Sequence, residues 1–260
     1  NVLGTGDHVL DFFRTVLDEV MDVFPSAYVH LGGDEVPTTE WERSPRARAR
    51  AVREGLAGPR ALHPWFIARL SEHLVRAGRR PVVWAESGVA LPLDCTVMSW
   101  REPAHARAAA LRGHQVVHAD HRAAYFDYAR GPGPGEPPAQ PGGIVDLRAV
   151  HDVDLAPPTP EAASLVLGAQ GQLWTEFVRT PQHIEYLTYP RLCALADRVW
   201  GGTADWPGFT ARLAGHRARL DALDVPHATP PAGLPLSFPH TTHHPPTLPR
   251  RREPCRKDPA

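Results

Sequence analysis

A short apolar segment followed by two glycines and two acids sets the architecture of this chain; it reads Ala27-Tyr28-Val29-His30-Leu31-Gly32-Gly33-Asp34-Glu35. Residues 27–31 are predicted to form a buried strand, since they lie between Pro25, which ends a helical pattern, and the glycine pair. On a regular strand, neighbouring side chains point to opposite faces of the sheet. The two glycines allow a sharp turn, so both carboxylates could reach one pocket.

The same pattern of strand and helix recurs along the chain. Further short strands are predicted at 81–86, 95–100, 115–119 and 165–174. Helices are predicted at 8–24, 44–56, 64–77, 103–112, 181–200 and 206–222. A long loop is predicted between Arg130 and Gly143, where Gly and Pro dominate. Short apolar strands that alternate with helices favour a parallel α/β sheet.

Chemically versatile residues recur where the predicted strands end: Asp34, Glu35, Trp84, Trp100, Trp174 and Glu176. A (β/α)₈ barrel has its active site at this end of its strands. Only five strands are predicted, so the fold is expected to be an incomplete TIM (β/α)₈ barrel, about strands 4 to 8 with their helices. We expect the other three strands to lie upstream of Asn1. The partial barrel is predicted to span 1–225, and the Pro/His/Arg-rich tail at 226–260 is predicted to be disordered.

The composition narrows the class of protein. A chain of 260 residues with 42% hydrophobic residues can form one sizeable core. Its 28 basic and 29 acidic residues give no reason to expect a nucleic-acid partner. No run approaches the roughly 20 apolar residues of a membrane span. The three cysteines are far apart and predict neither a disulfide framework nor a metal cluster. Compartment and oligomeric state cannot be read from this sequence.

The residue types at the strand ends indicate carbohydrate chemistry. Two carboxylates about 5–5.5 Å apart are the geometry of retaining glycosidases, in which one is protonated and the other ionised. A pyranose has apolar C–H faces, which indole rings can cover. Trp84, Trp100 and Trp174 are therefore candidate pocket walls. Two further pairs offer a ring or hydroxyl beside an acceptor for sugar hydroxyls: Tyr125 with Asp127, and Trp174 with Glu176.

The segment 30–35 resembles the His-x-Gly-Gly-Asp-Glu signature of the family 20 glycoside hydrolases, the β-N-acetylhexosaminidases. Five more segments resemble the family in the expected order: Gly78-Arg79-Arg80-Pro81-Val82-Val83-Trp84-Ala85-Glu86, Val97-Met98-Ser99-Trp100, Tyr125-Phe126-Asp127, Leu167-Gly168-Ala169-Gln170-Gly171-Gln172-Leu173-Trp174-Thr175-Glu176 and Tyr189-Pro190-Arg191-Leu192-Cys193-Ala194-Leu195-Ala196-Asp197-Arg198-Val199-Trp200. Six such segments in register are far more specific than one. The similarity covers roughly residues 1–225.

The resemblance implies hydrolysis of terminal non-reducing β-linked N-acetylglucosamine or N-acetylgalactosamine, with an oxazolinium intermediate formed by the substrate's own acetamido oxygen. Glu35 would be the general acid and later the general base, and Asp34 would bind the acetamido N–H. Tyr125 would bind the acetamido oxygen. Five residues would bind the sugar, the tryptophans by enclosing it and the acids through hydroxyls: Trp84, Trp100, Trp174, Asp127 and Glu176. No metal or organic cofactor is implied.

Two features depart from the family pattern. Ala85 stands where the family usually has Asp or Asn. The arginine that binds the terminal sugar in the family belongs to the part expected upstream.

Three alternatives stay open. The chain could be a truncated, inactive remnant or a sugar-binding pseudoenzyme. It could be a retaining glycosidase with a protein nucleophile, which predicts a trapped glycosyl ester. A metal hydrolase that uses His30, Asp34 and Glu35 is disfavoured, because no helical His-x-x-x-His pair accompanies them.

Overall fold

The computed structural model describes residues 2–85, 91–133, 136–201 and 204–228. Five strands form a parallel sheet in the order β1-β2-β3-β4-β7: β1 (Tyr28–His30), β2 (Arg80–Ala85), β3 (Thr96–Ser99), β4 (Val116–His118) and β7 (Val166–Ala169). The predicted parallel α/β sheet is therefore confirmed. A five-stranded parallel sheet with helices is consistent with part of an α/β barrel.

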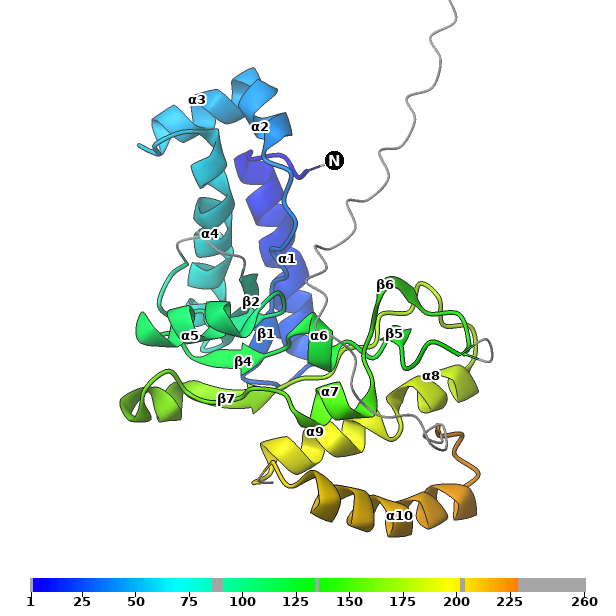
Figure 1. Cartoon of the computed structure of the whole chain (residues 1–260). Helices are drawn as coiled ribbons and strands as arrows, with labels where there is room; N and C mark the ends of the chain where they lie inside the picture. Colours follow the sequence, from blue (N-terminus) through cyan, green and yellow to red (C-terminus); the bar gives the residue numbers. More distant parts are fainter. Residues whose placement is uncertain (1, 86–90, 134–135, 202–203, 229–260) are drawn as a thin grey trace, which may run out of the picture.

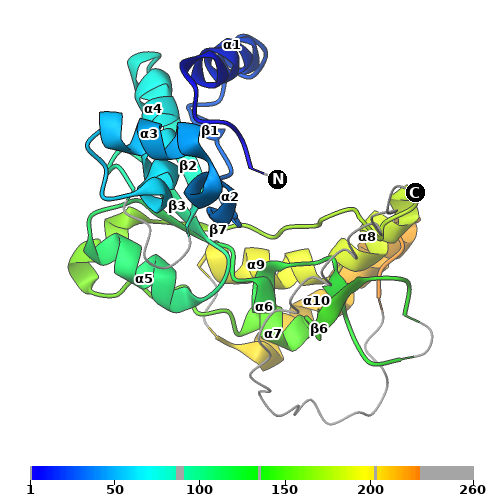
Figure 2. The same cartoon turned by 90° about the horizontal axis from the view of Figure 1, so that it is seen from above.

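Helices cover one face of this sheet (Figures 1 and 2). Helix α1 (Asp7–Val23) packs on α4 (Leu62–Arg76), and α4 packs on β2. Helix α5 (Pro103–Leu111) lies against β3 and β4, and α9 (Arg191–Val199) lies against β7. Alternate strand residues face opposite sides. Val83 packs with Ile67 of α4, whereas Val82 packs with Met98 on the other face.

The largest apolar cluster joins α1 to α4. Apolar residues at helical spacing give α1 one buried face, on which Leu10 and Leu17 lie. Leu62 and Leu74, at the two ends of α4, are fully shielded from solvent. These contacts place α4 on β2, beside the turn that follows β1.

Several shorter elements were not predicted. They are α2 (Thr39–Arg43), η1 (Pro59–Ala61), β5 (Tyr128–Ala129), α6 (His121–Ala124), β6 (Gln140–Ile144), α7 (Leu147–His151) and η2 (Pro160–Leu165). Strands β5 and β6 pair with each other at the ends of the predicted Gly/Pro-rich loop. Two predicted helices are present as α3 (Pro45–Arg53) and α10 (Trp206–Ala222).

The prediction of a single helix at 181–200 is wrong. The structure has two helices there, α8 (Pro181–Thr188) and α9. Pro190 cannot continue the hydrogen-bond ladder of a helix, and it pushes the preceding residue out of the helical region. Tyr189 is accordingly extended, with φ −98° and ψ 136°.

The strand predicted at 165–174 is also too long, since β7 ends at Ala169. Beyond it the chain leaves β4 and approaches the segment after α6, where Gln172 forms an isolated parallel bridge with Tyr125. Gly171 permits this approach, because a Cβ there would lie 2.6 Å from the ring of Phe126. Trp174 therefore lies in irregular chain beyond the strand.

Part of the sequence prediction falls outside the described residues, namely Glu86 and residues 229–260 of the predicted tail. The described part of 226–260 ends at Ala228, which is buried and donates its N–H to the carbonyl of Tyr189. Among the described helices, none has the length and apolar character needed to cross a bilayer.

The α1–α4 cluster makes a stability prediction. Leu74→Ala leaves a cavity in a fully buried site, so it should lower the free energy of unfolding by about 2–5 kcal/mol. Leu111→Ala is the matched control, because Leu111 is 63% exposed and its loss should cost less than about 0.5 kcal/mol. Urea unfolding of both variants measures the difference. Equal losses would contradict the position of α4 in the core.

Candidate active site

The turn after β1 depends on left-handed backbone at three positions. Gly32 has φ 71°, Gly33 has φ 95° and Glu35 has φ 51°. Glycine adopts such angles without steric cost, whereas for Glu35 they are strained by about 1–2 kcal/mol. The turn leaves the side chains of Asp34 and Glu35 exposed to solvent. The predicted glycine break is confirmed, and it delivers both carboxylates at the end of β1.

Two histidines hold this turn. The N–H of Gly32 donates to Nδ1 of His30 over 2.9 Å. Desolvation of the ring lowers the pKa of His30 to about 4, so Nδ1 is free to accept at neutral pH. Nε2 of His63, in the first turn of α4, lies 2.7 Å from the carbonyl oxygen of Gly33 and therefore donates to it. His63 was not predicted, because nothing in its sequence neighbourhood links it to a residue 30 positions away.

The four predicted aromatic residues form one continuous wall. The rings of Trp84 and Trp174 lie 6.3 Å apart, and Trp174 contacts Tyr125 at 6.2 Å. Tyr125 stacks on Trp100 at 6.3 Å. His30 joins the wall at Trp84, at 4.8 Å. We call Trp84, Trp174, Tyr125 and Trp100 the aromatic wall.

Arg101 connects the carboxylate of Glu35 to this wall. Arg101 lies 3.7 Å from the carboxylate of Glu35 and 4.1 Å above the ring of Trp100. Burial raises the pKa of the Tyr125 hydroxyl, and the negative charges of Asp127 and Asp34 raise it further. Tyr125 therefore stays protonated and can donate a hydrogen bond. Arg101 was not among the predicted site residues, although it directly follows Trp100.

Asp127 is the buried acid of the site, with only 4% of its surface exposed. Burial raises its pKa to about 6, and the nearby charge of Glu176 adds to this shift. Within the described part of the chain, neither Oδ1 of Asp127 nor Nε1 of Trp100 has a hydrogen-bond partner. Buried polar atoms are usually paired, so these two atoms retain the capacity to form a hydrogen bond.

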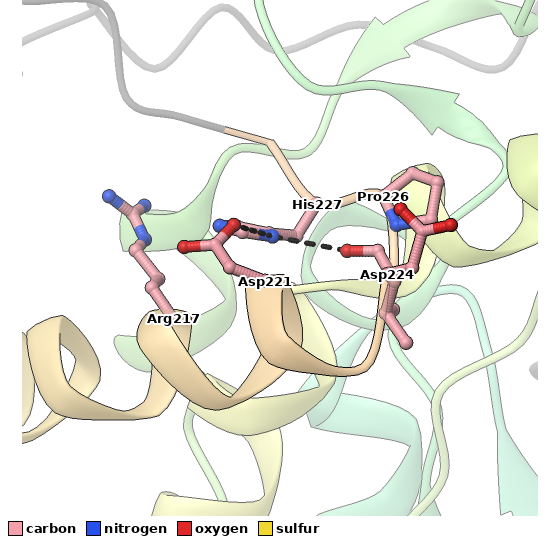
Figure 3. Close-up of a pocket in the computed structure, with 6 residues that line it drawn as sticks. Arg217, Asp221, Asp224, Pro226 and His227 are labelled. Atoms are coloured by element: carbon pink, nitrogen blue, oxygen red, sulfur yellow. Dashed lines mark hydrogen bonds and ion pairs between the residues drawn. The ribbon is translucent and has the colours of Figure 1, made fainter.

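A hollow of about 420 Å³ lies along the sheet, and His30, Val82, Met98 and Gln170 help to line it. A second hollow, of about 500 Å³, lies at the end of α10 and is shown in Figure 3. Its lining consists of Arg217, Asp221, Asp224, Val225, Pro226 and His227, none of which was predicted for the site.

The glycine turn gives a prediction with an internal control. Gly32→Ala adds a Cβ that would meet nothing within 4 Å, so it should cost only the backbone strain of about 1–2 kcal/mol. Gly33→Ala adds a Cβ 2.9 Å from Cδ1 of Ile67, and overpacking should cost about 1–3 kcal/mol more. Ile67→Val removes that methyl group and should recover stability in the Gly33→Ala background. Thermal unfolding of the set tests this; no recovery would contradict the contact.

Asp127 predicts a pH dependence of stability. Its folded pKa of about 6 exceeds its ordinary value of 3.8, so the unfolded chain ionises first as the pH rises. The free energy of unfolding of the parent protein should therefore decrease as the pH rises from 3.8 to about 6, and it should stay lower above that pH. Asp127→Asn should therefore gain about 3 kcal/mol relative to the parent between pH 4 and pH 7, as measured by urea unfolding. A difference that does not change with pH would refute the raised pKa.

Several known proteins are similar to this chain in sequence. The family model described as "Glycosyl hydrolase family 20, catalytic domain" matches residues 1–203. A "Beta-hexosaminidase" of Porphyromonas gingivalis is 34% identical over 231 residues, which cover 86% of this chain and 30% of that protein. The chain thus spans less than a third of this relative's length.

Solved structures are also similar to the structure of this chain. The GH20 exo β-N-acetylglucosaminidase of Vibrio harveyi, in complex with N-acetylglucosamine, superposes with a TM-score of 0.81 at 29% identity and covers 88% of this chain and 37% of that one. The β-N-acetylhexosaminidase of Bacteroides fragilis gives a TM-score of 0.74 at 28% identity, with 86% and 46% covered. Because the family model matches residues 1–203, which are most of this chain, the chain belongs to glycosyl hydrolase family 20.

Proposed function

We propose that this chain carries the acid/base pair and the acetamido pocket of a β-N-acetylhexosaminidase. The substrate would be a terminal non-reducing β-linked N-acetylglucosamine or N-acetylgalactosamine. The observation that carries the proposal is the junction of the Asp34-Glu35 turn with the aromatic wall through Arg101, which contacts both Glu35 and Trp100. A pocket that joins stacked rings to two carboxylates suits a sugar with a reactive glycosidic bond.

Glu35 handles protons in this proposal. Its exposed side chain can reach a glycosidic oxygen, to which it donates a proton as the sugar–aglycone bond breaks. It then accepts a proton from the water that opens the intermediate. A second carboxylate that attacked the sugar would form a covalent ester. The acetamido oxygen of the substrate replaces that nucleophile and closes an oxazolinium ring.

Asp34 and Tyr125 would align this internal nucleophile. Asp34 would accept the acetamido N–H and stabilise the positive charge that develops as the ring closes. Tyr125, which burial keeps protonated, would donate to the acetamido oxygen. Trp84, Trp100 and Trp174 would enclose the acetamido group and the sugar ring. The unpaired oxygen of Asp127, together with Glu176, would accept hydrogen bonds from sugar hydroxyls.

The sheet would supply strands 4 to 8 of a (β/α)₈ barrel, with the site at the carboxyl ends of its strands. The names of the relatives support the proposed substrate, since the Vibrio harveyi structure contains N-acetylglucosamine. The mechanism requires no metal or organic cofactor, because the residues named above provide every proton transfer and charge.

A second candidate is a sugar-binding protein without turnover. It is favoured by the exposure of the Asp34 and Glu35 side chains, because an open site admits water, which weakens the electrostatic interactions that catalysis requires. Binding of N-acetylglucosamine by calorimetry without hydrolysis of any N-acetylhexosaminide would favour this candidate.

Leaving-group dependence tests the assigned roles in the full-length protein. Glu35→Gln should lower kcat/KM by about 10²–10⁴ on a chitooligosaccharide, whose leaving group needs a proton, and far less on a nitrophenyl glycoside. Asp34→Asn should slow both substrates, because it weakens the acetamido attack itself. Glu19→Gln on the exposed face of α1 is the matched control and should change neither rate. Unchanged chitooligosaccharide hydrolysis in Glu35→Gln would show that Glu35 is not the acid.

A further inference from the structure

The first residue of α9, Arg191, is fully buried. Burial lowers the pKa of its guanidinium to about 9, so it still carries a charge at neutral pH. Burying an arginine is costly unless its donors are paired. No ion pair of Arg191 with a carboxylate is seen among the described residues, so its pairing must come from elsewhere.

Backbone carbonyls supply that pairing. Nη1 donates to the carbonyl of Val145 over 2.8 Å and to that of Tyr128 over 3.1 Å. Nη2 donates to the carbonyl of Phe126, and both Nε and Nη2 donate to that of Leu187, over 2.9 and 2.7 Å. The guanidinium plane also lies 5.2 Å from the ring of Phe126. The guanidinium of Arg191 thus connects α8, β5, the chain before α7 and the segment 125–128.

The segment that Arg191 holds carries one member of the aromatic wall, Tyr125, and the buried acid Asp127. Phe126 stands between Tyr125 and Asp127, and its ring packs against Gly171. On the opposite side, the N–H of Phe126 donates to Gln172 over 2.6 Å. The backbone of Phe126 is therefore fixed at its N–H by Gln172 and at its C=O by Arg191.

We infer that Arg191 is a positioning residue for the site: it sets the places of Tyr125 and Asp127 by clamping the carbonyls around them. This inference rests on the proposed function, in which these two residues bind the substrate. Lysine keeps the charge but cannot donate to four carbonyls at once, because it lacks the planar fork. A displacement of about 1 Å in a binding group can cost about 100-fold in rate.

The test is a double-mutant cycle in the full-length protein on a nitrophenyl N-acetylglucosaminide. Arg191→Lys should lower kcat/KM by about 10- to 100-fold in folded protein. In an Asp127→Asn background, where the acid it places is already lost, Arg191→Lys should cost at least about three-fold less. Losses that multiply independently would overturn the inference. Arg50→Lys is the matched control, since Arg50 is also buried but pairs with Asp7 and Glu54 away from the site; its kcat/KM should stay within about two-fold of the parent.

A second readout does not need activity. Amide hydrogen exchange of residues 125–129 should accelerate at least about ten-fold in Arg191→Lys and stay unchanged in Arg50→Lys. Unchanged exchange at 125–129 would overturn the inference. A parent that hydrolyses nothing but shows this exchange pattern would overturn the proposed function and leave the clamp supported.

If Arg191→Lys does not fold, Phe126→Leu takes its place in the same cycle. It keeps every carbonyl and donor and removes the ring beside the guanidinium. A smaller loss of kcat/KM that still shrinks in the Asp127→Asn background supports the clamp, and independent losses overturn it.

Discussion

The parallel pairing of β1, β2, β3 and β4 is the constraint on which the site depends. Parallel strands end at one edge of the sheet, so segments far apart in sequence meet there. The turn after β1 bonds to β2 through the N–H of Trp84 and the carbonyl of Gly32, over 3.0 Å. Trp100 directly follows β3. This shared edge is what places the turn that carries the carboxylates beside Trp84 and Trp100.

Much of this arrangement could be predicted from the sequence, because strand polarity and glycine geometry are local properties. The five apolar segments predict the strands, and the two glycines predict the turn. The two wrong predictions, the helix at 181–200 and the length of the strand at 165–174, also have local causes. Pro190 lies inside the predicted helix at 181–200, and its effect on Tyr189 divides that helix into two. Gly171 similarly marked the place where the chain leaves β7 to meet Phe126.

The residues that hold the site in place could not be predicted. His63 contacts a backbone carbonyl 30 positions away in sequence, and three of the four carbonyls that Arg191 contacts lie 46 to 65 positions away. A carbonyl leaves no residue-specific trace in a sequence, so no spacing or motif reveals such a contact. The burial of Asp127 is likewise a product of tertiary packing, and with it the raised pKa. Sequence patterns thus indicate the candidate site residues and omit the residues that hold them in position.

The central claim is that the substrate's acetamido group, and no carboxylate of the protein, attacks the sugar. A thiazoline analogue of the oxazolinium ion tests it most directly, because intermediate analogues bind at least about 100-fold more tightly than substrates. Competitive inhibition of that strength is predicted, with the intact mass of the protein unchanged during turnover. Weak inhibition, together with a glycosyl adduct in the mass spectrum of acid-quenched protein, would contradict it.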